Sequence, residues 1–238
     1  MRTSRVFASL LLVCIAAQSL ALPWQLWTGQ DVVQVDSVAE GTGTTTFSWT
    51  HTPVGTLAGV LVACFTNVTS TDVISGATYD GEAMTLVARA VDTASEIGSV
   101  EVYYLGTGVN TGAVSAQCTV SSGTDAKHGV SVGVRAPKDT EVSSCTSAEI
   151  TDPSCTATVT SGASLSIASL WSGENAPSGN AMAANQAWLL AHNHDFGTTT
   201  TMVAYQQHTR AGGDSLIATN MTSDADSALV GAAIRVVP

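Results

Sequence analysis

Short runs of apolar and β-branched residues, separated by clusters of glycine, serine, asparagine, aspartate and proline, recur from residue 45 to the end of the chain. Several alternate with a period of two: Val100, Val102 and Tyr104 fall on one side of their run, and the valines of Val130–Arg135 do the same. Half-buried antiparallel strands produce this alternation. About eleven such runs predict an all-β domain built as an antiparallel β-sandwich. The predicted strands are Thr45–His51, Gly59–Thr66, Ala83–Val91, Ser99–Leu105, Ala113–Val120, Gly129–Ala136, Cys155–Thr160, Ser164–Trp171, Ala187–His192, Thr200–His208 and Ala228–Val237.

The charge balance of the 238-residue chain restricts the classes of molecule that it can bind. Eight Lys and Arg residues stand against 19 Asp and Glu, which gives a net charge of −11, and no run of basic residues occurs. A nucleic-acid-binding protein needs a basic surface, so this class is excluded. Charged residues make up only 11% of the chain and apolar ones 45%, which also excludes a charged disordered chain. Apart from a weak candidate at Asn180–Ala191, no amphipathic helix is predicted.

The first 21 residues have the pattern of a secretory signal peptide. Arg2 and Arg5 precede the apolar run Val6–Ala17, and Ser19-Leu20-Ala21 places small residues where a signal peptidase cuts. The apolar run is about 12 residues long, shorter than the roughly 20 that a membrane span needs. We therefore expect residues 1–21 to be a signal peptide, the mature chain to be secreted, extracellular or at a particle surface, and no stable transmembrane span to remain.

Residues 22–44 are predicted to form an N-terminal arm that precedes a β-sandwich domain of residues 45–238. The arm carries Trp24 and Trp27, whose amphipathic rings could anchor it against a partner subunit. The alternative is that both rings fold back onto the sandwich of their own chain.

Four cysteines, Cys64, Cys118, Cys145 and Cys155, remain after the signal peptide. In the oxidising compartment that a secreted chain enters, four thiols allow three pairings. Cys145 and Cys155 flank a loop with proline and aspartate and are predicted to form one disulfide, and Cys64 and Cys118, both in predicted strands, to form another. Four buried free thiols are the alternative. A zinc knuckle is disfavoured, since nine residues separate the closest pair of cysteines, where such sites commonly use two to four.

Two N-x-Ser/Thr triplets without a central proline begin at Asn67 and Asn220. Both are acceptors for N-linked glycans in a host that glycosylates secreted proteins. Such triplets also occur often by chance in a threonine-rich chain, so they permit a glycoprotein and do not establish one.

The segment Tyr79-Asp80-Gly81-Glu82-Ala83-Met84-Thr85 combines a turn signal with the start of a strand. Asp80-Gly81 predicts a tight hairpin turn, because glycine adopts a positive φ without steric cost. Tyr79 and Met84 are then expected to face each other across the hairpin and to fill the core. The Tyr-x-Gly-x-x-Met-Thr pattern resembles that of secreted and phage-encoded β-sandwich structural proteins.

This resemblance extends in order over roughly residues 45–238. Leu61-Val62, Val100–Leu105, Gly162–Leu165 and Ala232–Arg235 resemble further strands of those proteins. The four cysteines and Glu82 depart from their pattern. The resemblance implies a jelly-roll-like sandwich in a surface or virion structural protein, and it offers no catalytic residues to carry over.

His192-Asn193-His194-Asp195 is the densest cluster of metal-ligating residue types. On a strand, His192 and His194 point to the same side, because side chains alternate with a period of two. Two imidazoles so placed can hold a transition metal, with Asp195 or His208 as a third ligand. The alternative is a polar strand end that leads into a turn.

Calcium is a second cation to consider for an acidic secreted sandwich. Asp224-Ala225-Asp226 presents two carboxylates two residues apart, with Asp214 nearby in the sequence. Calcium takes six to eight oxygen ligands, mostly from loops. No loop of the D-x-[DN]-x-[DN]-G type occurs, so solvated turn acids are the alternative, and no other cofactor is indicated.

Nothing in the sequence marks a catalytic site. Glu82, Glu101 and Asp92 qualify as acids by residue type only, and hydrolysis needs a poised carboxylate pair or a nucleophile beside a base. No G-x-S-x-G or H-E-x-x-H motif occurs. The chain is therefore predicted not to be an enzyme.

The sequence is compatible with two classes of function. The first is a secreted structural or assembly protein of a surface layer, an extracellular filament or a virion coat, which associates with copies of itself. The second is a lectin-like carbohydrate-binding module, in which Trp171, Trp188, Tyr103 and Tyr205 would stack on sugar rings, although each could equally be core. Function resides in sites rather than in folds, so the fold alone does not choose between them.

Overall fold

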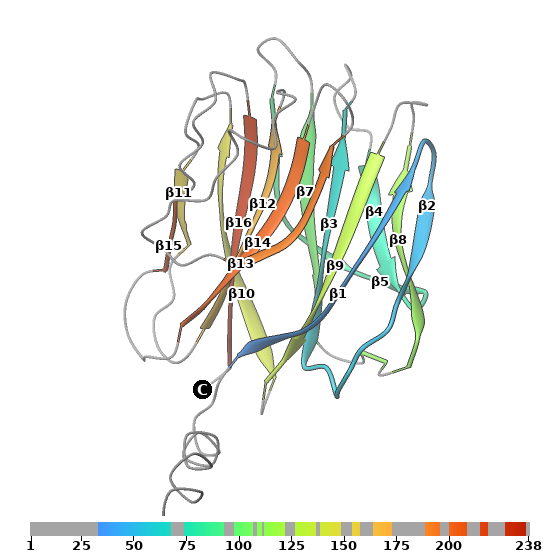
Figure 1. Cartoon of the computed structure of the whole chain (residues 1–238), viewed down its shortest axis with the longest axis vertical. Coiled ribbons are helices and arrows are strands. Elements are labelled where there is room, and N and C mark those ends of the chain that lie inside the picture. Colours follow the sequence, from blue (N-terminus) through green and yellow to red (C-terminus); the bar gives the residue numbers. More distant parts are fainter. Residues whose placement is uncertain are drawn as a thin grey trace, which may run out of the picture. The chain divides into compact units, whose positions relative to one another are not determined.

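The computed structural model describes residues 33–67, 74–92, 98–106, 109–110, 112–121, 127–136, 139–148, 154–157, 164–172, 189–195, 200–208, 215–218 and 227–236. Within them all regular structure is β, in sixteen strands (Figure 1). The strands are β1 Gln34–Gly43, β2 Phe47–His51, β3 Gly59–Thr66, β4 Ile74–Tyr79, β5 Glu82–Ala83, β6 Thr85–Val91, β7 Ser99–Leu105, β8 Val114–Val120, β9 Lys127–Arg135, β10 Thr140–Ala148, β11 Ser154–Ala157, β12 Ser164–Ser172, β13 Leu189–Asp195, β14 Thr200–His208, β15 Ser215–Ala218 and β16 Ser227–Val236. No helix in this part of the chain has the length and apolar character to cross a membrane.

The strands form four sheets. Sheet A has the order β1-β9-β3-β7-β6, sheet B β2-β8-β4-β5, sheet C β10-β16-β12-β14-β13, and sheet D is the pair β11-β15. Every pairing is antiparallel. The expected all-β antiparallel sandwich is confirmed.

Sheet A is covered on both of its faces. Leu61, Ala63 and Phe65 of β3 pack with sheet C in one core, whereas Val60 and Val62 pack with sheet B in another. A third, smaller core joins the far side of sheet C to Ala157 of sheet D. Successive side chains of a strand point to opposite faces, so both rows of side chains on a strand between two layers are buried. This explains why β3 is buried along its whole length.

The structure has more strands than the expected eleven or so: β1, β4, β10 and β15 were not predicted, and the predicted strand Ala83–Val91 is divided into β5 and β6. Two of the added strands have a reason visible in their sequences. β1 reads QVDSVAEGTG and β10 reads TEVSSCTSA, which resemble turns in their glycine, serine and threonine content. Both are edge strands, and an edge strand needs fewer apolar residues than a central one because one side of it faces no neighbour. A jelly roll has two packed sheets, whereas sheets A, B and C form three packed layers here.

The domain boundary expected at residue 45 is too late. Residues 34–43 of the predicted arm form β1, which pairs with β9 of the same chain from Gln34↔Arg135 to Gly43↔Lys127. The pairing uses the main-chain hydrogen-bonding groups on one side of this segment within its own sandwich. Trp24, Trp27 and the predicted signal peptide lie outside the described residues.

The predicted hairpin turn forms at Asp80-Gly81. Asp80 and Gly81 have φ values of 54° and 82° and join β4 to β5, with Tyr79 opposite Glu82. Positive φ at both central residues is the signature of a type I′ turn. Tyr79 and Met84 are both buried in the core between sheets A and B. Met84 nevertheless lies opposite Ala77, to whose carbonyl oxygen its N–H donates at 3.0 Å, and not opposite Tyr79 as expected.

Candidate functional site

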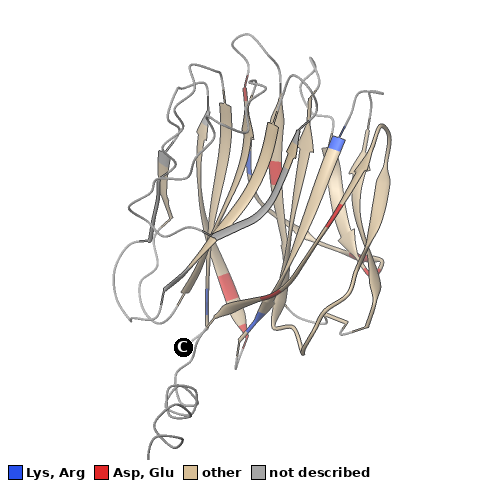
Figure 2. Cartoon of the chain, viewed as in Figure 1, with Lys and Arg blue, Asp and Glu red and all other residues tan. Residues whose placement is uncertain are grey.

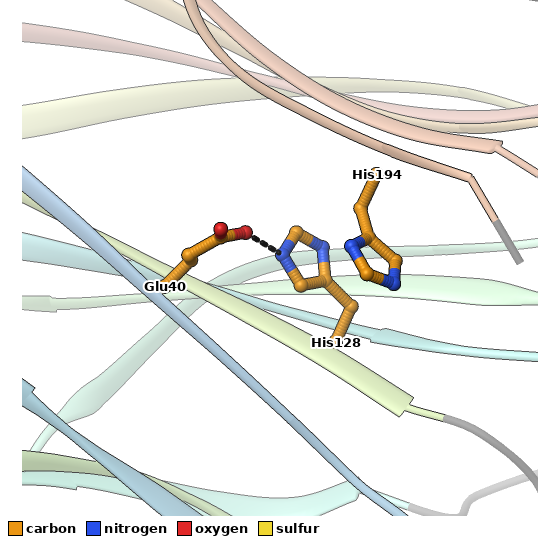
Figure 3. A group of neighbouring side chains, drawn as sticks. All are labelled: Glu40, His128 and His194. Atoms are coloured by element: carbon orange, nitrogen blue, oxygen red, sulfur yellow. Dashed lines mark hydrogen bonds and ion pairs between the residues drawn. The ribbon is translucent and has the colours of Figure 1, made fainter.

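Glu40, His128 and His194 form a cluster of metal-ligating side chains (Figure 3). Glu40 lies on β1 and His128 on β9, where the register Thr42↔His128 makes the two residues diagonal neighbours. Long side chains on such a diagonal reach each other. His194 comes from β13 of sheet C. One potential ligand atom from each of the three residues lies within 4.8 Å of the others.

His128 is the buried centre of this cluster. Its Nε2 lies 3.0 Å from Oε2 of Glu40, and its Nδ1 lies 2.7 Å from Oγ1 of Thr201 on β14. An ionised carboxylate only accepts hydrogen bonds, so Nε2 donates to Glu40, and Nδ1 of a neutral ring then accepts from the Thr201 hydroxyl. The rings of Phe65 and His194 stack on that of His128 with centroid distances of 5.6 and 4.8 Å.

The cluster has one protected side and one open side. His128 and Thr201 are fully buried, whereas the Glu40 side chain is 44% exposed. A site of this kind can be reached from solvent at the carboxylate while the imidazole is held by the core. Two imidazoles and a carboxylate are suitable ligands for zinc and neighbouring transition metals.

Of the ligands predicted from the sequence, His194 belongs to this cluster. The backbone of β13 pairs His192 with Val203 and Asp195 with Thr200, but the side chains of both residues, and that of His208, lie outside what the structure describes. Asp214, Asp224 and Asp226 lie outside it entirely. Sequence reasoning missed Glu40 and His128 because they are 88 residues apart and meet only through sheet pairing. One sequence signal could have identified His128: it continues the alternating row of Val130, Val132 and Val134, which was predicted to lie on one face of its strand.

A second polar network is buried between sheets A and B around His51. Its Nε2 lies 2.7 Å from Oγ of Ser37 and its Nδ1 lies 2.7 Å from Oγ of Ser131, which also accepts from Trp49 Nε1 at 2.9 Å. Burial lowers the pKa of His51, and the charge of Asp36 opposes this by raising it. A catalytic triad sets its histidine between a nucleophile and a carboxylate, whereas both nitrogens of His51 meet hydroxyls. The network therefore has the form of a structural one.

An open groove of about 520 Å³ lies beside β6, β10 and the end of β7. Its polar groups are engaged with one another: the Tyr104 hydroxyl bonds Thr140 Oγ1, and Glu141 forms an ion pair with Arg235. Burial raises the pKa of Tyr104 to about 12, against the effect of its hydrogen bond with Thr140. The hydroxyl thus stays protonated at neutral pH and acts as a hydrogen-bonding group rather than a base.

The three acids that the sequence offered as catalytic candidates lie in different local environments. Glu101 is buried, accepts a hydrogen bond from the Tyr103 hydroxyl at 2.6 Å and pairs with Arg89 at 3.2 Å. Asp92 is buried at the end of β6, and Glu82 is exposed in the β4–β5 hairpin. A glycosidase needs two carboxyl groups that face one substrate, an arrangement that these acids do not present.

The aromatic residues considered for sugar stacking belong largely to the core. Trp171 and Tyr103 are buried, and Tyr205 is half-buried and packs against the core between sheets A and C. Trp188 lies outside the described residues. A sugar-binding platform requires exposed rings, so Trp171 and Tyr103 are not available for one in this fold.

Both predicted disulfides are present. Cys64 of β3 bonds Cys118 of β8, which links sheets A and B across a sequence separation of 54. Cys145 of β10 bonds Cys155 of β11, which links sheets C and D across a separation of 10. Of the two predicted glycosylation sites, Asn67 is half-buried directly after β3, and Asn220 lies outside the described residues.

The positions of Lys and Arg are few and scattered along the described strands, as are those of Asp and Glu (Figure 2). Comparison with protein-family models, with curated proteins and with solved structures gave no match. The function of this chain has to be argued from its own geometry.

Proposed function

We propose that this chain is a secreted, non-catalytic structural protein that associates with copies of itself in a surface layer, an extracellular filament or a virion coat. The observation that carries the proposal is the pair of disulfides, each of which ties two of the stacked sheets together. One disulfide joins sheet A to sheet B and the other joins sheet C to sheet D. Disulfides form and persist in oxidising compartments, which agrees with a secretory signal peptide at residues 1–21.

The surface of the sandwich supports self-association. Monomeric sheet proteins commonly guard their edge strands with lysine, but of the two lysines here Lys127 is buried and donates to the Thr44 carbonyl oxygen. Lys138 lies outside the described residues. On the edge strands of sheet A, Leu86 of β6 is 49% exposed and Val38 of β1 is 37% exposed. These edges offer apolar side chains, and their charged residues are Asp36 and Glu40 on β1 and Arg89 on β6, which pairs with Glu101.

The polar groups of the interior support a structural role in a different way. Buried His51 has a hydroxyl partner at each ring nitrogen, and buried Glu101 accepts a hydrogen bond from Tyr103 and pairs with Arg89, whose side chain is 28% exposed. Buried polar groups that are fully hydrogen-bonded make packing specific, at little net gain in stability. A rigid, specifically packed building unit is what an assembly requires.

The test is the mass of the purified, secreted chain, measured by light scattering over a range of concentrations and combined with electron microscopy of the same samples. The expected result is a mass that rises with concentration and ends in ordered particles, sheets or filaments. A monomer at every concentration would contradict the proposal. Binding of that monomer to a glycan array would then favour the carbohydrate-binding alternative.

A further inference from the structure

We infer that Glu40, His128 and His194 bind one divalent transition-metal ion of the zinc type, and that this ion cross-links sheets A and C. The three residues supply two imidazole nitrogens and one carboxylate oxygen, within 4.8 Å of one another. Three protein ligands of these types, with water in the remaining position, form a tetrahedral zinc site. The inference is independent of self-association, because it concerns a site within a single chain.

One distance of the cluster, between His128 and Glu40, is close to that of an occupied site, and the ligand atoms of all three residues lie within 4.8 Å of one another. Zinc lies about 2.0–2.2 Å from its nitrogen and oxygen ligands, so two ligand atoms on one tetrahedral ion are about 3.3 Å apart. Nε2 of His128 and Oε2 of Glu40 are already 3.0 Å apart. His194 is half-buried and the Glu40 side chain is partly exposed, so rotation of these two side chains can complete the coordination while His128 stays fixed.

The surroundings of His128 orient the ring for metal binding. Ligating histidines almost always donate their other N–H to a neighbouring acceptor, which fixes the tautomer and the ring direction. Thr201 Oγ1 lies 2.7 Å from Nδ1 of His128 and can accept this N–H once Nε2 binds the ion. Phe65 stacks on the ring and closes its buried side. Two neutral imidazoles and one carboxylate leave the ion with a net charge of +1, which an acidic chain with a net charge of −11 tolerates well.

The position of the cluster gives the ion a structural purpose. In the described part of the chain all four cysteines are used, one pair across sheets A and B and the other across sheets C and D. Neither disulfide crosses the interface between sheets A and C. Glu40 and His128 belong to sheet A and His194 to sheet C, so a shared ion ties together the two sheets that the disulfides leave unlinked.

The experiment uses the full secreted chain without a histidine tag, stripped with a chelator and titrated with Zn²⁺ in a calorimeter at neutral pH. The expected result is one ion bound per chain and an increase in Tm upon binding. Loss of one outer-shell hydrogen bond already weakens metal sites by about 10–100-fold. Glu40→Gln and His194→Gln should therefore weaken Zn²⁺ binding by at least about ten-fold, and Thr201→Val by about 10–100-fold.

Glu141→Gln is the matched control, because the Glu141 side chain is 43% exposed, like that of Glu40, and pairs with Arg235 away from the cluster. It should bind Zn²⁺ like the unaltered chain. Substitutions of buried His128 could prevent folding, so the test relies on Glu40→Gln, which changes a partly exposed side chain. Circular dichroism checks that this variant is folded. The inference is overturned if the unaltered chain binds no stoichiometric Zn²⁺. It is also overturned if folded Glu40→Gln binds Zn²⁺ as tightly as the unaltered chain, or if Glu141→Gln removes binding.

Discussion

Gly41 and Gly129 lie opposite each other on β1 and β9 and make room for the indole of Trp49 from sheet B. A Cβ atom at Gly129 would lie 2.4 Å from Cη2 of Trp49 and 3.2 Å from Sγ of Cys118. These glycines are thus required for a close approach of two sheets, beside the disulfide that joins them. Their role is steric and does not depend on an unusual backbone conformation.

We expect Gly129→Ala to lower the free energy of unfolding by about 1–3 kcal/mol, because an added methyl group forces the ring or the backbone to move. Urea denaturation followed by circular dichroism measures the change. Gly76→Ala is the matched control, since a Cβ atom on this β4 glycine meets nothing within 4 Å. Equal effects of the two substitutions would show that the Trp49 contact is not the cause.

His51 is expected to make the stability of the protein depend on pH. Burial holds its pKa below 6.5 in the folded state, despite the raising effect of Asp36. As the pH falls below about 6.5, the unfolded chain binds a proton that folded His51 does not, so the free energy of unfolding decreases. Proton NMR should find the His51 ring titrating below pH 6.5. In His51→Gln the decrease in stability between pH 6.5 and 5 should be smaller, and an unchanged slope would contradict this role.

At the scale of elements, the two disulfides differ in their accessibility. Cys64 and Cys118 are fully buried between sheets A and B, whereas Cys145 and Cys155 are half-buried at the edge of sheet C. Thiolate attack on a disulfide requires access to sulfur. Local opening of β10 and β11 is enough to expose the Cys145–Cys155 bond, which encloses the shorter of the two loops.

We therefore expect a mild reductant under native conditions to open Cys145–Cys155 first and to leave Cys64–Cys118 intact until the protein unfolds. Alkylation followed by peptide mass spectrometry identifies the cysteines released at each time. In the chain-entropy model, Cys145–Cys155 contributes about 3 kcal/mol to the free energy of unfolding and Cys64–Cys118 about 4 kcal/mol. Loss of Cys64–Cys118 should therefore also lower the stability more. Simultaneous release of all four thiols from folded protein would be evidence against this order.

Elements with a strong local signal could be predicted from the sequence. Alternation in Val100–Leu105 and the Asp80-Gly81 turn are properties of neighbouring residues, and the strand and the turn form where they were expected. The strand is not half-buried as its alternation predicted, because β7 belongs to sheet A, which is covered on both faces, and is buried from Ser99 to Tyr104. β1 and β10 were missed because edge strands tolerate polar sequences. The Glu40–His128 contact was missed because it depends on the β1–β9 register, and His194 joins them from the opposing sheet. Such contacts between distant strands leave no trace in local periodicity.

At the scale of the whole molecule, a stack of sheets buries its apolar residues between layers and leaves its edges for contact with other molecules. Sheet A has two edges, β1 and β6. On β6, the Val87 carbonyl oxygen accepts from Ser144 of β10 at 3.2 Å, so part of this edge is already covered. The Thr85–Leu86 end is exposed and borders the groove beside β10, which makes it the most open apolar part of a described edge.

If self-association uses this edge, Leu86→Lys should abolish it, because a charged side chain at an edge strand must be desolvated when another strand docks there. The fold should be unaffected, since the Leu86 side chain is already 49% exposed. Val54→Lys is the matched control: Val54 is 83% exposed but lies in the loop between β2 and β3. Light scattering should find Leu86→Lys monomeric at concentrations where the unaltered chain and Val54→Lys assemble. Assembly of all three alike would place the contact elsewhere on the surface, whereas loss of assembly in both variants would point to a general effect of added charge.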